Sequence, residues 1–272
     1  MDDKLRRLQL EELEILKMFA ALCDQYKLRY FLLGGTLLGA IRHDGFIPWD
    51  DDVDVCMPRS DYEKFLKIAS GKLQEPYSLS CQERNPEYRY CFARISSSRM
   101  KIRNRSANKP RIENAWIDII PMDGMPQKKP ALLLHKMKLR FWRGMNQIAQ
   151  YDELVDQKRK RGAVETVIVK IAGWKIWRQM TDYHKCMEHI RRELKKYDYD
   201  QSDVIINYMA AYGFKEVFNK KDFGDGAVYY FEGIPFKGPV NYDAVLKTIY
   251  GDYMKLPPES DRNKHNAEIL DA

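Results

Sequence analysis

The stretch from Leu33 to Val55 constrains the fold most, because it places a glycine turn and an acid-bearing strand close together. The apolar run Tyr30–Leu33 ends at Gly34-Gly35 and predicts a buried strand that enters a tight turn. A short helical pattern follows, with Thr36 as a plausible N-cap. After a turn-rich loop, Asp52-Val53-Asp54-Val55 alternates acids with valines, as a strand does. In such a strand Asp52 and Asp54 lie on one face, beside the glycine turn.

The rest of the chain mixes helical and strand patterns, which predicts an α+β domain with a mixed sheet flanked by helices. Helices are expected at 4–28, 59–69 (with Ser60 as cap), 130–196 apart from a charged break at 156–162, and 242–250. Strands are expected at 77–81, 90–95, 100–102 and 115–120, with a turn at 121–124. A hairpin is expected around Glu232-Gly233. We expect one domain over residues 1–272, with a mostly helical basic insertion at 128–225.

The charge is unevenly distributed along the chain. The net charge is +7, whereas residues 128–192 alone contain 16 Lys and Arg against 6 Asp and Glu. This segment forms either solvated helices or a surface that contacts anionic lipid or a polyanionic acceptor. Within it, Ala163–Gln179 combines tryptophan and aliphatic residues with cations, and either binds a membrane interface or packs on the core.

Composition narrows the cellular setting. The mean hydropathy is −0.57 and there is no long uncharged apolar run, so a membrane span is not expected. The N-terminus lacks the apolar region of a secretory signal. Five cysteines without a C-x-x-C pair argue against a zinc knuckle or a disulfide framework and favour a reducing cytoplasm.

Three aspartates are the strongest candidates for chemistry. Two carboxylates on one strand face repel each other, so Asp52 and Asp54 favour a shared divalent cation. Asp118 lies within the apolar strand 115–120, where an isolated charge is costly. A Gly-Gly turn that opens a helix also presents N–H groups to phosphate. Each feature alone has a plainer reading: an ordinary turn, a solvated acidic loop, a hydrogen-bonded structural acid. Together they indicate transfer at phosphorus.

The same residues resemble the signature of the LicD family of bacterial phosphocholine transferases, related to fukutin and fukutin-related protein. Leu33–Asp54 is similar to the first family motif, Trp116–Gly124 to the strand with the third acid, and Tyr250–Glu259 to the C-terminal signature. These matches bracket nearly the whole chain, whereas 128–225 has no matching pattern. The resemblance implies a nucleotidyltransferase-like mixed sheet.

The resemblance also implies roles for individual residues. Asp52, Asp54 and Asp118 would be catalytic and would hold Mg²⁺ or Mn²⁺, as one or two ions. Donor phosphate would be bound by Gly34, Gly35, Thr36, Arg42 and His43, with His43 as readily ordering the loop. A second layer of residues would orient the groups that bind metal and phosphate: Trp49, Asp50, Asp51 and Asp123.

The implied reaction is transfer of a phospho-alcohol from a CDP-alcohol to a hydroxyl of a cell-surface glycan or its lipid-linked precursor, with release of CMP. The alcohol could be choline, ribitol, glycerol or another, and no specific nucleic acid is expected. The enzyme would be cytoplasmic or peripheral at the inner face of the membrane. Two alternatives stay open: a nucleotidyltransferase that moves a nucleoside monophosphate from an NTP to a small molecule, sugar or RNA, and a non-catalytic module that binds polyanions through residues 128–192.

Overall fold

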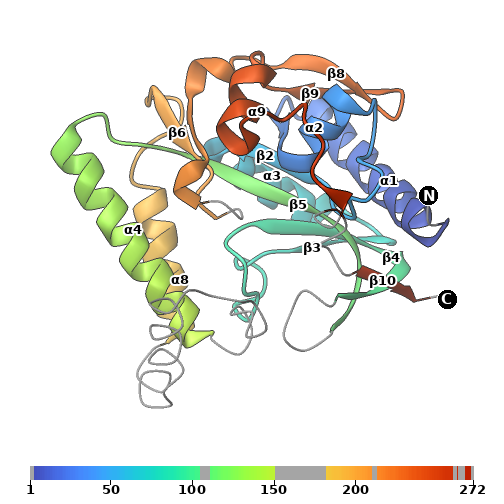
Figure 1. The fold of residues 1–272 in the computed structure, drawn as a ribbon. Coiled ribbons are helices and arrows are strands. Elements are labelled where there is room, and N and C mark those ends of the chain that lie inside the picture. Colours follow the sequence, from blue (N-terminus) through green and yellow to red (C-terminus); the bar gives the residue numbers. More distant parts are fainter. Residues whose placement is uncertain are drawn as a thin grey trace.

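A mixed sheet of eight strands forms the centre of the protein (Figure 1). The computed structural model describes residues 3–104, 111–150, 182–209, 213–259, 262 and 267–270. The strand order is β1-β2-β5-β4-β10, with β3 paired to β4, and β6 joining β5 to β7. The strands are β1 (Phe31–Leu32), β2 (Asp54–Pro58), β3 (Tyr77–Ser80), β4 (Ala93–Asn104), β5 (Arg111–Gly124), β6 (Val204–Ile206), β7 (Val217–Asn219) and β10 (Ala267–Leu270). The β2–β5 pair is parallel, and its neighbours are antiparallel, so the expected mixed sheet is confirmed.

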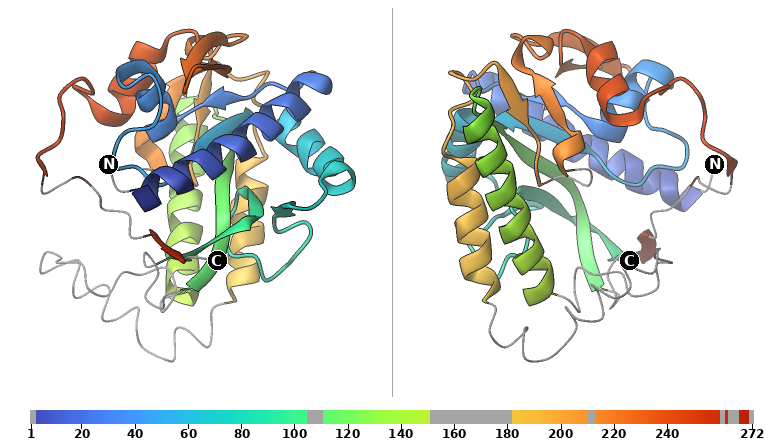
Figure 2. Two further views of the ribbon diagram at one scale, coloured as in Figure 1. Left: turned by 90° about the vertical axis from the view of Figure 1, so that its right-hand side faces the viewer. Right: turned by 60° about the vertical axis from the view of Figure 1, so that its left-hand side comes forward.

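Helices cover this sheet and extend from one side of it (Figure 2). They are α1 (Asp3–Gln25), α2 (Gly34–Arg42), α3 (Arg59–Lys72), α4 (Lys129–Ala149), α8 (Tyr183–Leu194) and α9 (Tyr242–Tyr250), with short 3₁₀ turns η1 (Gly213–Lys215) and η2 (Lys220–Asp222). Helix α1 packs on β4 and β5, whereas α4 and α8 pack on each other. The hairpin of β8 (Ala227–Phe231) and β9 (Ile234–Gly238), and helix α9, confirm the sequence prediction.

The apolar stripe of α1 anchors the main core. Leu16 and Phe19 are fully buried, and Phe19 meets Tyr30 and Phe65 edge-on at centroid distances of 5.3 and 5.1 Å. Edge-to-face rings at this spacing pack favourably beyond the area they bury. The amphipathic pattern read from the sequence therefore places α1 against the sheet, as expected for a helix with one apolar face.

Two helix starts differ from the sequence prediction. Helix α2 begins at Gly34, not after Thr36; Leu33 precedes it without a side-chain cap, and Gly34 has a φ of +58°. The glycine accepts this left-handed geometry, so the chain turns directly from β1 into the helix. The Thr36 hydroxyl instead accepts the Asp54 N–H at 2.8 Å. Helix α3 begins directly after Pro58, and the Ser60 hydroxyl points to Asp200 rather than capping the helix.

The strands also differ in extent from the prediction. The two strands expected at 90–95 and 100–102 are one strand, β4, with a register shift between Ser97 and Lys101. The turn expected at 121–124 was wrong, because β5 runs to Gly124. Residues 121 and 122 of β5 pair with β2, and Asp123 and Gly124 pair with β6. Because these neighbours supply pairing partners, the chain stays extended beyond Pro121. Strand β2 begins at Asp54, so Asp52 lies in the preceding loop, and the prediction that Asp52 and Asp54 share one strand face was wrong.

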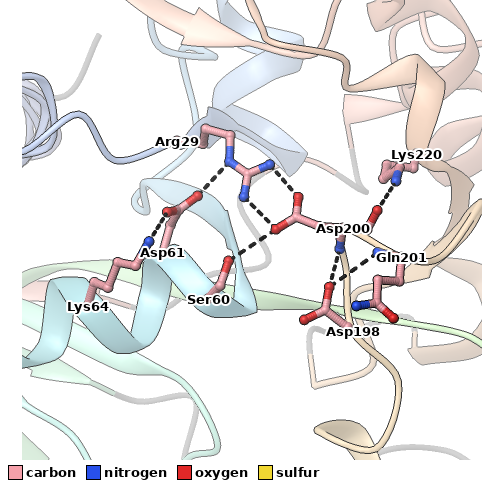
Figure 3. A network of polar contacts seen from close by, with 8 residues as sticks. All are labelled: Arg29, Ser60, Asp61, Lys64, Asp198, Asp200, Gln201 and Lys220. Atoms are coloured by element: carbon pink, nitrogen blue, oxygen red, sulfur yellow. Dashed lines mark hydrogen bonds and ion pairs between the residues drawn. The ribbon is translucent and has the colours of Figure 1, made fainter.

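The segment 128–225 is connected to the sheet rather than only appended to it. Its described part contains α4, α8, β6 and β7, and β6 pairs with the end of β5. A polar network joins this segment to the core (Figure 3). Arg29 donates to Asp61 at 2.6 Å and to both oxygens of Asp200 at 2.6 and 2.9 Å. The predicted break at 156–162 and the segment Ala163–Gln179 lie outside the described residues.

All five cysteines are free thiols, and four of them are buried. Burial raises the pKa of each thiol, to about 12 at Cys91. Among the helices within the described ranges, none is both long and apolar enough to cross a bilayer.

Candidate functional site

The parallel pairing of β2 and β5 brings two predicted acids together. Asp54 and Asp118 are register partners on these adjacent strands, which lie about 4.8 Å apart. The Asp118 N–H donates to the Val53 carbonyl at 2.9 Å, and the Leu33 N–H donates to the Asp54 carbonyl at 3.2 Å. The sheet therefore places Asp54 between the glycine turn on one side and Asp118 on the other.

The glycine turn lies so close to the acids that a Cβ on either glycine would crowd a carboxylate. A Cβ on Gly34 would lie 3.1 Å from the Asp54 carboxylate, and one on Gly35 would collide with the Asp50 carboxylate. The first-turn N–H groups of a helix have no partner within the helix and carry a partial positive charge. The start of α2 thus supplies donors for an anion next to Asp54 and Asp50.

Several carboxylates are close together and partly shielded from solvent beside the start of α2. Burial raises the pKa of Asp54 well above its ordinary value, and the charges of Asp52 and Asp118 raise it further. Burial followed by the charge of Asp52 likewise raises the pKa of Asp50. We call Asp50, Asp52, Asp54 and Asp118 the acid site. Repulsion among these carboxylates favours a bound cation.

Arg94 on β4 neutralises Asp118. Its Nε donates to Asp118 Oδ1 at 2.7 Å and its Nη2 to Oδ2 at 3.4 Å. Burial raises the pKa of Asp118, and Arg94 opposes that rise. The guanidinium carbon also lies 4.3 Å from the ring centroids of both Tyr90 and Trp116. Stacked on both rings and bonded to a carboxylate, this arginine is firmly positioned.

The donor atoms of the acid site suit a hard divalent cation, although three ligands do not converge in this conformation. In the part of the chain that the structure describes, no group of three His, Cys, Asp or Glu side chains forms a ready metal site. Mg²⁺ is commonly held by one or two carboxylates together with substrate phosphates. Asp54 fits that scheme, because its desolvated carboxylate lies beside the helix start that would bind the phosphates and is repelled by the charge of Asp52.

Arg42 and Trp49 of the first motif contact the C-terminal segment, and His43 contacts both of them. Arg42 donates from Nη1 to the Tyr253 carbonyl at 2.5 Å and from Nε to His43 Nε2 at 3.0 Å. The ring of His43 meets Trp49 edge-on at 6.1 Å, and the Arg262 guanidinium carbon lies 4.7 Å from the Trp49 ring centroid. Burial, followed by the Arg42 charge, lowers the pKa of His43. The first and last family-like motifs are therefore joined in space.

The remaining predicted residues lie on either side of this centre. The Asp50 carbonyl accepts from Gln9 of α1 at 2.9 Å, and Asp51 follows in the same half-buried loop. Asp123 lies five residues beyond Asp118 along β5, about 17 Å away at 3.3 Å per residue. There it forms two 2.7 Å hydrogen bonds with Arg59 and is 1% exposed. The structure thus separates Asp123 from the acid site.

Sequence reasoning missed Glu12. This α1 residue is 2% exposed, and within the described structure its Oε2 has no hydrogen-bond partner. Burial raises its pKa well above the ordinary value, and the charges of Asp52, Asp51 and Asp50 add to the rise. The helical pattern could have identified it, because Glu12 occupies a position of the apolar stripe of α1 between Leu8 and Ile15. An acid on a buried helix face, which ordinarily costs stability, points to a charged neighbourhood.

A pocket opens beside Arg94, on the same face of the sheet as Asp118. It has a volume of about 310 Å³. We call it the aromatic pocket; its lining residues include Tyr88, Tyr90, Trp116, Glu113 and Asn114. Trp116 precedes Asp118 by two positions on β5, which corresponds to about 7 Å along the strand. The pocket therefore adjoins the acid site through Arg94 and Asp118.

Comparison with known proteins assigns the chain to a family. Residues 27–126 match the family model described as LicD/FKTN/FKRP, nucleotidyltransferase domain, which includes the glycine turn and the acid site. The lipopolysaccharide cholinephosphotransferase LicD of Haemophilus influenzae is 34% identical, over 97% of this chain and 96% of its own length. An uncharacterised protein of Rickettsia typhi is 32% identical over 84 residues, 29% of this chain and 27% of its own length. The chain belongs to the LicD family of phosphotransferases.

Proposed function

We propose that this enzyme transfers phosphocholine from CDP-choline to a hydroxyl of lipopolysaccharide or a related cell-surface glycan and releases CMP. The observation that carries the proposal is the similarity over nearly the whole chain to a lipopolysaccharide cholinephosphotransferase. The acid site and the glycine turn lie inside the region that matches the family model. The donor is inferred from the chemistry, because phosphocholine must arrive on a good leaving group.

The start of α2 would bind the donor diphosphate through the N–H groups of its first turn. Asp52 and Asp54 would hold one or two Mg²⁺ or Mn²⁺ ions against the same phosphates. A bound divalent ion supplies charge neutralisation for the leaving CMP. Gly34 and Gly35 leave the space for this approach, since a Cβ at either position would meet Asp54 or Asp50.

The acceptor hydroxyl would attack the phosphorus that bears choline. A new P–O bond forms, the P–O bond to CMP breaks, and the hydroxyl proton moves to the carboxylate of Asp118. Burial raises the pKa of Asp118, which makes it a better proton acceptor, while the charge and hydrogen bonds of Arg94 oppose that rise. Asp118 would therefore act on the acceptor and Asp54 on the donor.

The aromatic pocket would bind the glycan. The apolar face of a sugar ring can pack on Trp116 or Tyr90, and its hydroxyls can bond to side chains such as Asn114 and Glu113. The pocket adjoins Asp118, which is the acid assigned to the acceptor. An acceptor held there would present a hydroxyl at the boundary between the pocket and the acid site.

The test is a product analysis with purified protein, Mg²⁺ or Mn²⁺, CDP-choline and lipopolysaccharide that lacks phosphocholine. We expect CMP by chromatography and a phosphocholine increment on the glycan by mass spectrometry, both lost with a chelator. CDP-ribitol and CDP-glycerol in parallel identify the alcohol.

The family description also names a nucleotidyltransferase domain, so CTP and other NTPs belong in the same assay. Release of diphosphate from an NTP, with no CMP from any CDP-alcohol, would replace our proposal by nucleotidyl transfer. Absence of both products, with intact binding to anionic polymer, would favour a non-catalytic module.

A further inference from the structure

Helix α4 carries an apolar stripe that faces solvent. Its members are large apolar residues with exposed fractions of 62, 52, 57 and 58%: Leu133, Leu134, Met137 and Phe141. At 3.6 residues per turn these four positions lie within an arc of about 100°. Scattered exposed leucines are ordinary on a protein surface, whereas a contiguous stripe on one helix face marks a contact surface.

The opposite face of α4 is already used in packing. Leu139 is fully buried with Ile190 and Leu194 of α8, and Trp142 stacks on His189 at a centroid distance of 3.8 Å. His135 lies 3.6 Å from the Glu193 carboxylate of α8. Because the helix uses this face to pack on the protein, the stripe points away from α8 and is exposed in the part of the chain that the structure describes.

The charged side chains of α4 itself are all basic. The sequence of α4 contains Lys129, Lys136, Lys138, Arg140 and Arg143 and no acid. Lys129 and Arg140 are exposed and flank one side of the stripe, and Lys138 lies on the other side. Lys138 and Arg143 also bond to Glu193 and the Tyr208 carbonyl, so part of this charge is used inside the protein. Lys128 adds an exposed cation directly before the helix.

We propose that α4 docks this enzyme onto an anionic phospholipid surface, with the apolar stripe inserted among the acyl chains and the flanking cations against the headgroups. A polar partner would leave the four apolar side chains unsatisfied, and a neutral apolar partner would leave the cations unpaired. An anionic leaflet satisfies both, and each Lys or Arg near it contributes about 1 kcal/mol. The binding would be reversible, as expected for one interfacial helix.

The proposal does not depend on which alcohol the enzyme transfers. It gives a reason for the position of the surface, since an acceptor anchored in a bilayer would be reached from a docked enzyme. Helix α4 lies in the same basic segment, 128–192, as the membrane contact expected at Ala163–Gln179, which lies outside the described residues.

The test is sedimentation of the purified full-length protein with vesicles of phosphatidylglycerol and phosphatidylcholine, against vesicles of phosphatidylcholine alone. The test variant is L134S/F141S, which removes stripe residues that make no contact with the acid site. We expect wild type to bind the anionic vesicles, with at least a tenfold weaker partition for the variant and for neutral vesicles. The matched control is V228S/Y230S, which changes exposed apolar residues on β8 and should bind as wild type does.

The folding of each variant is checked by its circular dichroism spectrum and its melting temperature, which we expect to stay close to wild type because the altered side chains are exposed. Equal partition of L134S/F141S and wild type would overturn the proposal, as would negligible binding of wild type to anionic vesicles. A dimer of wild type that L134S/F141S converts to a monomer would assign the stripe to self-association instead. CMP release from CDP-choline, measured on the same samples without vesicles, reports separately on the proposed function.

Discussion

Asp54 meets three neighbours that a single side chain rarely meets together: the glycine turn, the partner acid Asp118 and the acids of the preceding loop. Its backbone N–H is held by Thr36 and its carbonyl by Leu33, so the carboxylate has little freedom to move away. The residue therefore carries an electrostatic cost in the folded protein. A group of this kind is commonly retained for chemistry rather than for stability.

Replacing Asp54 with Asn should lower the transfer rate by at least about 100-fold, the range for losing a group that acts on developing charge. The fold should remain, and the melting temperature without metal should rise, because one of several repelling charges is removed. Initial rates of CMP release and a thermal melt check both effects. More than a tenth of wild-type activity in Asp52→Asn/Asp54→Asn would contradict the assignment.

Asp118 and Asp123 lie on the same strand but should respond differently to the same substitution. Asp118→Asn should remove activity with a smaller effect on donor affinity, because Asp118 faces the acceptor side. Asp123→Asn should lower the free energy of unfolding by about 3–5 kcal/mol, because Arg59 would keep a buried charge without its partner. Urea denaturation and steady-state rates of both variants separate the effects. If the Asp123→Asn variant were stable but inactive, and the Asp118→Asn variant were active, then Asp123 and not Asp118 would be the catalytic acid of β5.

At the scale of elements, the β8–β9 hairpin supports the motif loop from a distance in sequence. Its turn residue Glu232 accepts from Arg6 of α1 at 2.6 and 3.0 Å and from the Phe46 N–H at 3.1 Å. A Cβ on Gly45 would collide with the same carboxylate, so the loop and the turn are closely packed. The hairpin thus links α1 to the loop that leads into the acid site.

This link should depend on pH. The Arg6 hydrogen bond lowers the pKa of Glu232 below its ordinary 4.5, with burial opposing and the Phe46 N–H assisting. A lowered folded pKa stabilises the protein above the unfolded pKa, and this contribution is lost as the pH falls through the folded pKa. Glu232→Gln should therefore melt below wild type at pH 7, and the difference should shrink below about pH 4.5. Glu14→Gln, an exposed position paired only with Lys17 within the described contacts, is the control. An unchanged difference across the pH range would contradict the ionic link.

The strands β4 and β5 together build the aromatic pocket, and its proposed role in acceptor binding predicts a kinetic asymmetry. Trp116→Ala should raise KM for the glycan at least about tenfold, the scale of losing 1–3 kcal/mol of apolar contact. KM for CDP-choline should change little. Trp116→Phe, which keeps a ring, should recover most of the affinity. An increase confined to the donor KM would assign the pocket to choline instead, where aromatic rings also suit a quaternary ammonium.

Local patterns predicted most elements, and the errors lie where distant residues decide. The period of α1, the hairpin and α9 could be read directly, because each depends on neighbouring residues. The start of α2 at Gly34 depends on packing against Asp54, and the continuation of β5 through Pro121 depends on β2. Arg94 could not be assigned to Asp118 from spacing, because the two residues lie on different strands and are 24 positions apart. The candidate acids were predicted; the groups that neutralise or accompany them were not.

For the whole molecule, binding of donor and metal should be visible as stabilisation. The charges of the acid site oppose folding until a cation arrives, so CDP alone should raise the melting temperature less than CDP with Mg²⁺ or Mn²⁺. A ligand at 100 times its Kd contributes about 2.7 kcal/mol, which corresponds to about 5 °C for a domain of this size. Differential scanning fluorimetry of wild type and Asp54→Asn checks this, and the metal-dependent part should vanish in the variant. Equal shifts with and without metal would count against the two-carboxylate scheme.

The state of the cysteines makes the protein convenient for spectroscopic reporters. The thiolate is the form that attacks thiol reagents, and all five native thiols have raised pKa values, with four of them buried. A cysteine introduced on an exposed helix position, such as Leu134→Cys, would react with maleimide first at neutral pH. A fluorophore or nitroxide could thus be placed on a chosen surface of the otherwise native chain, without first replacing buried cysteines that contribute to its packing.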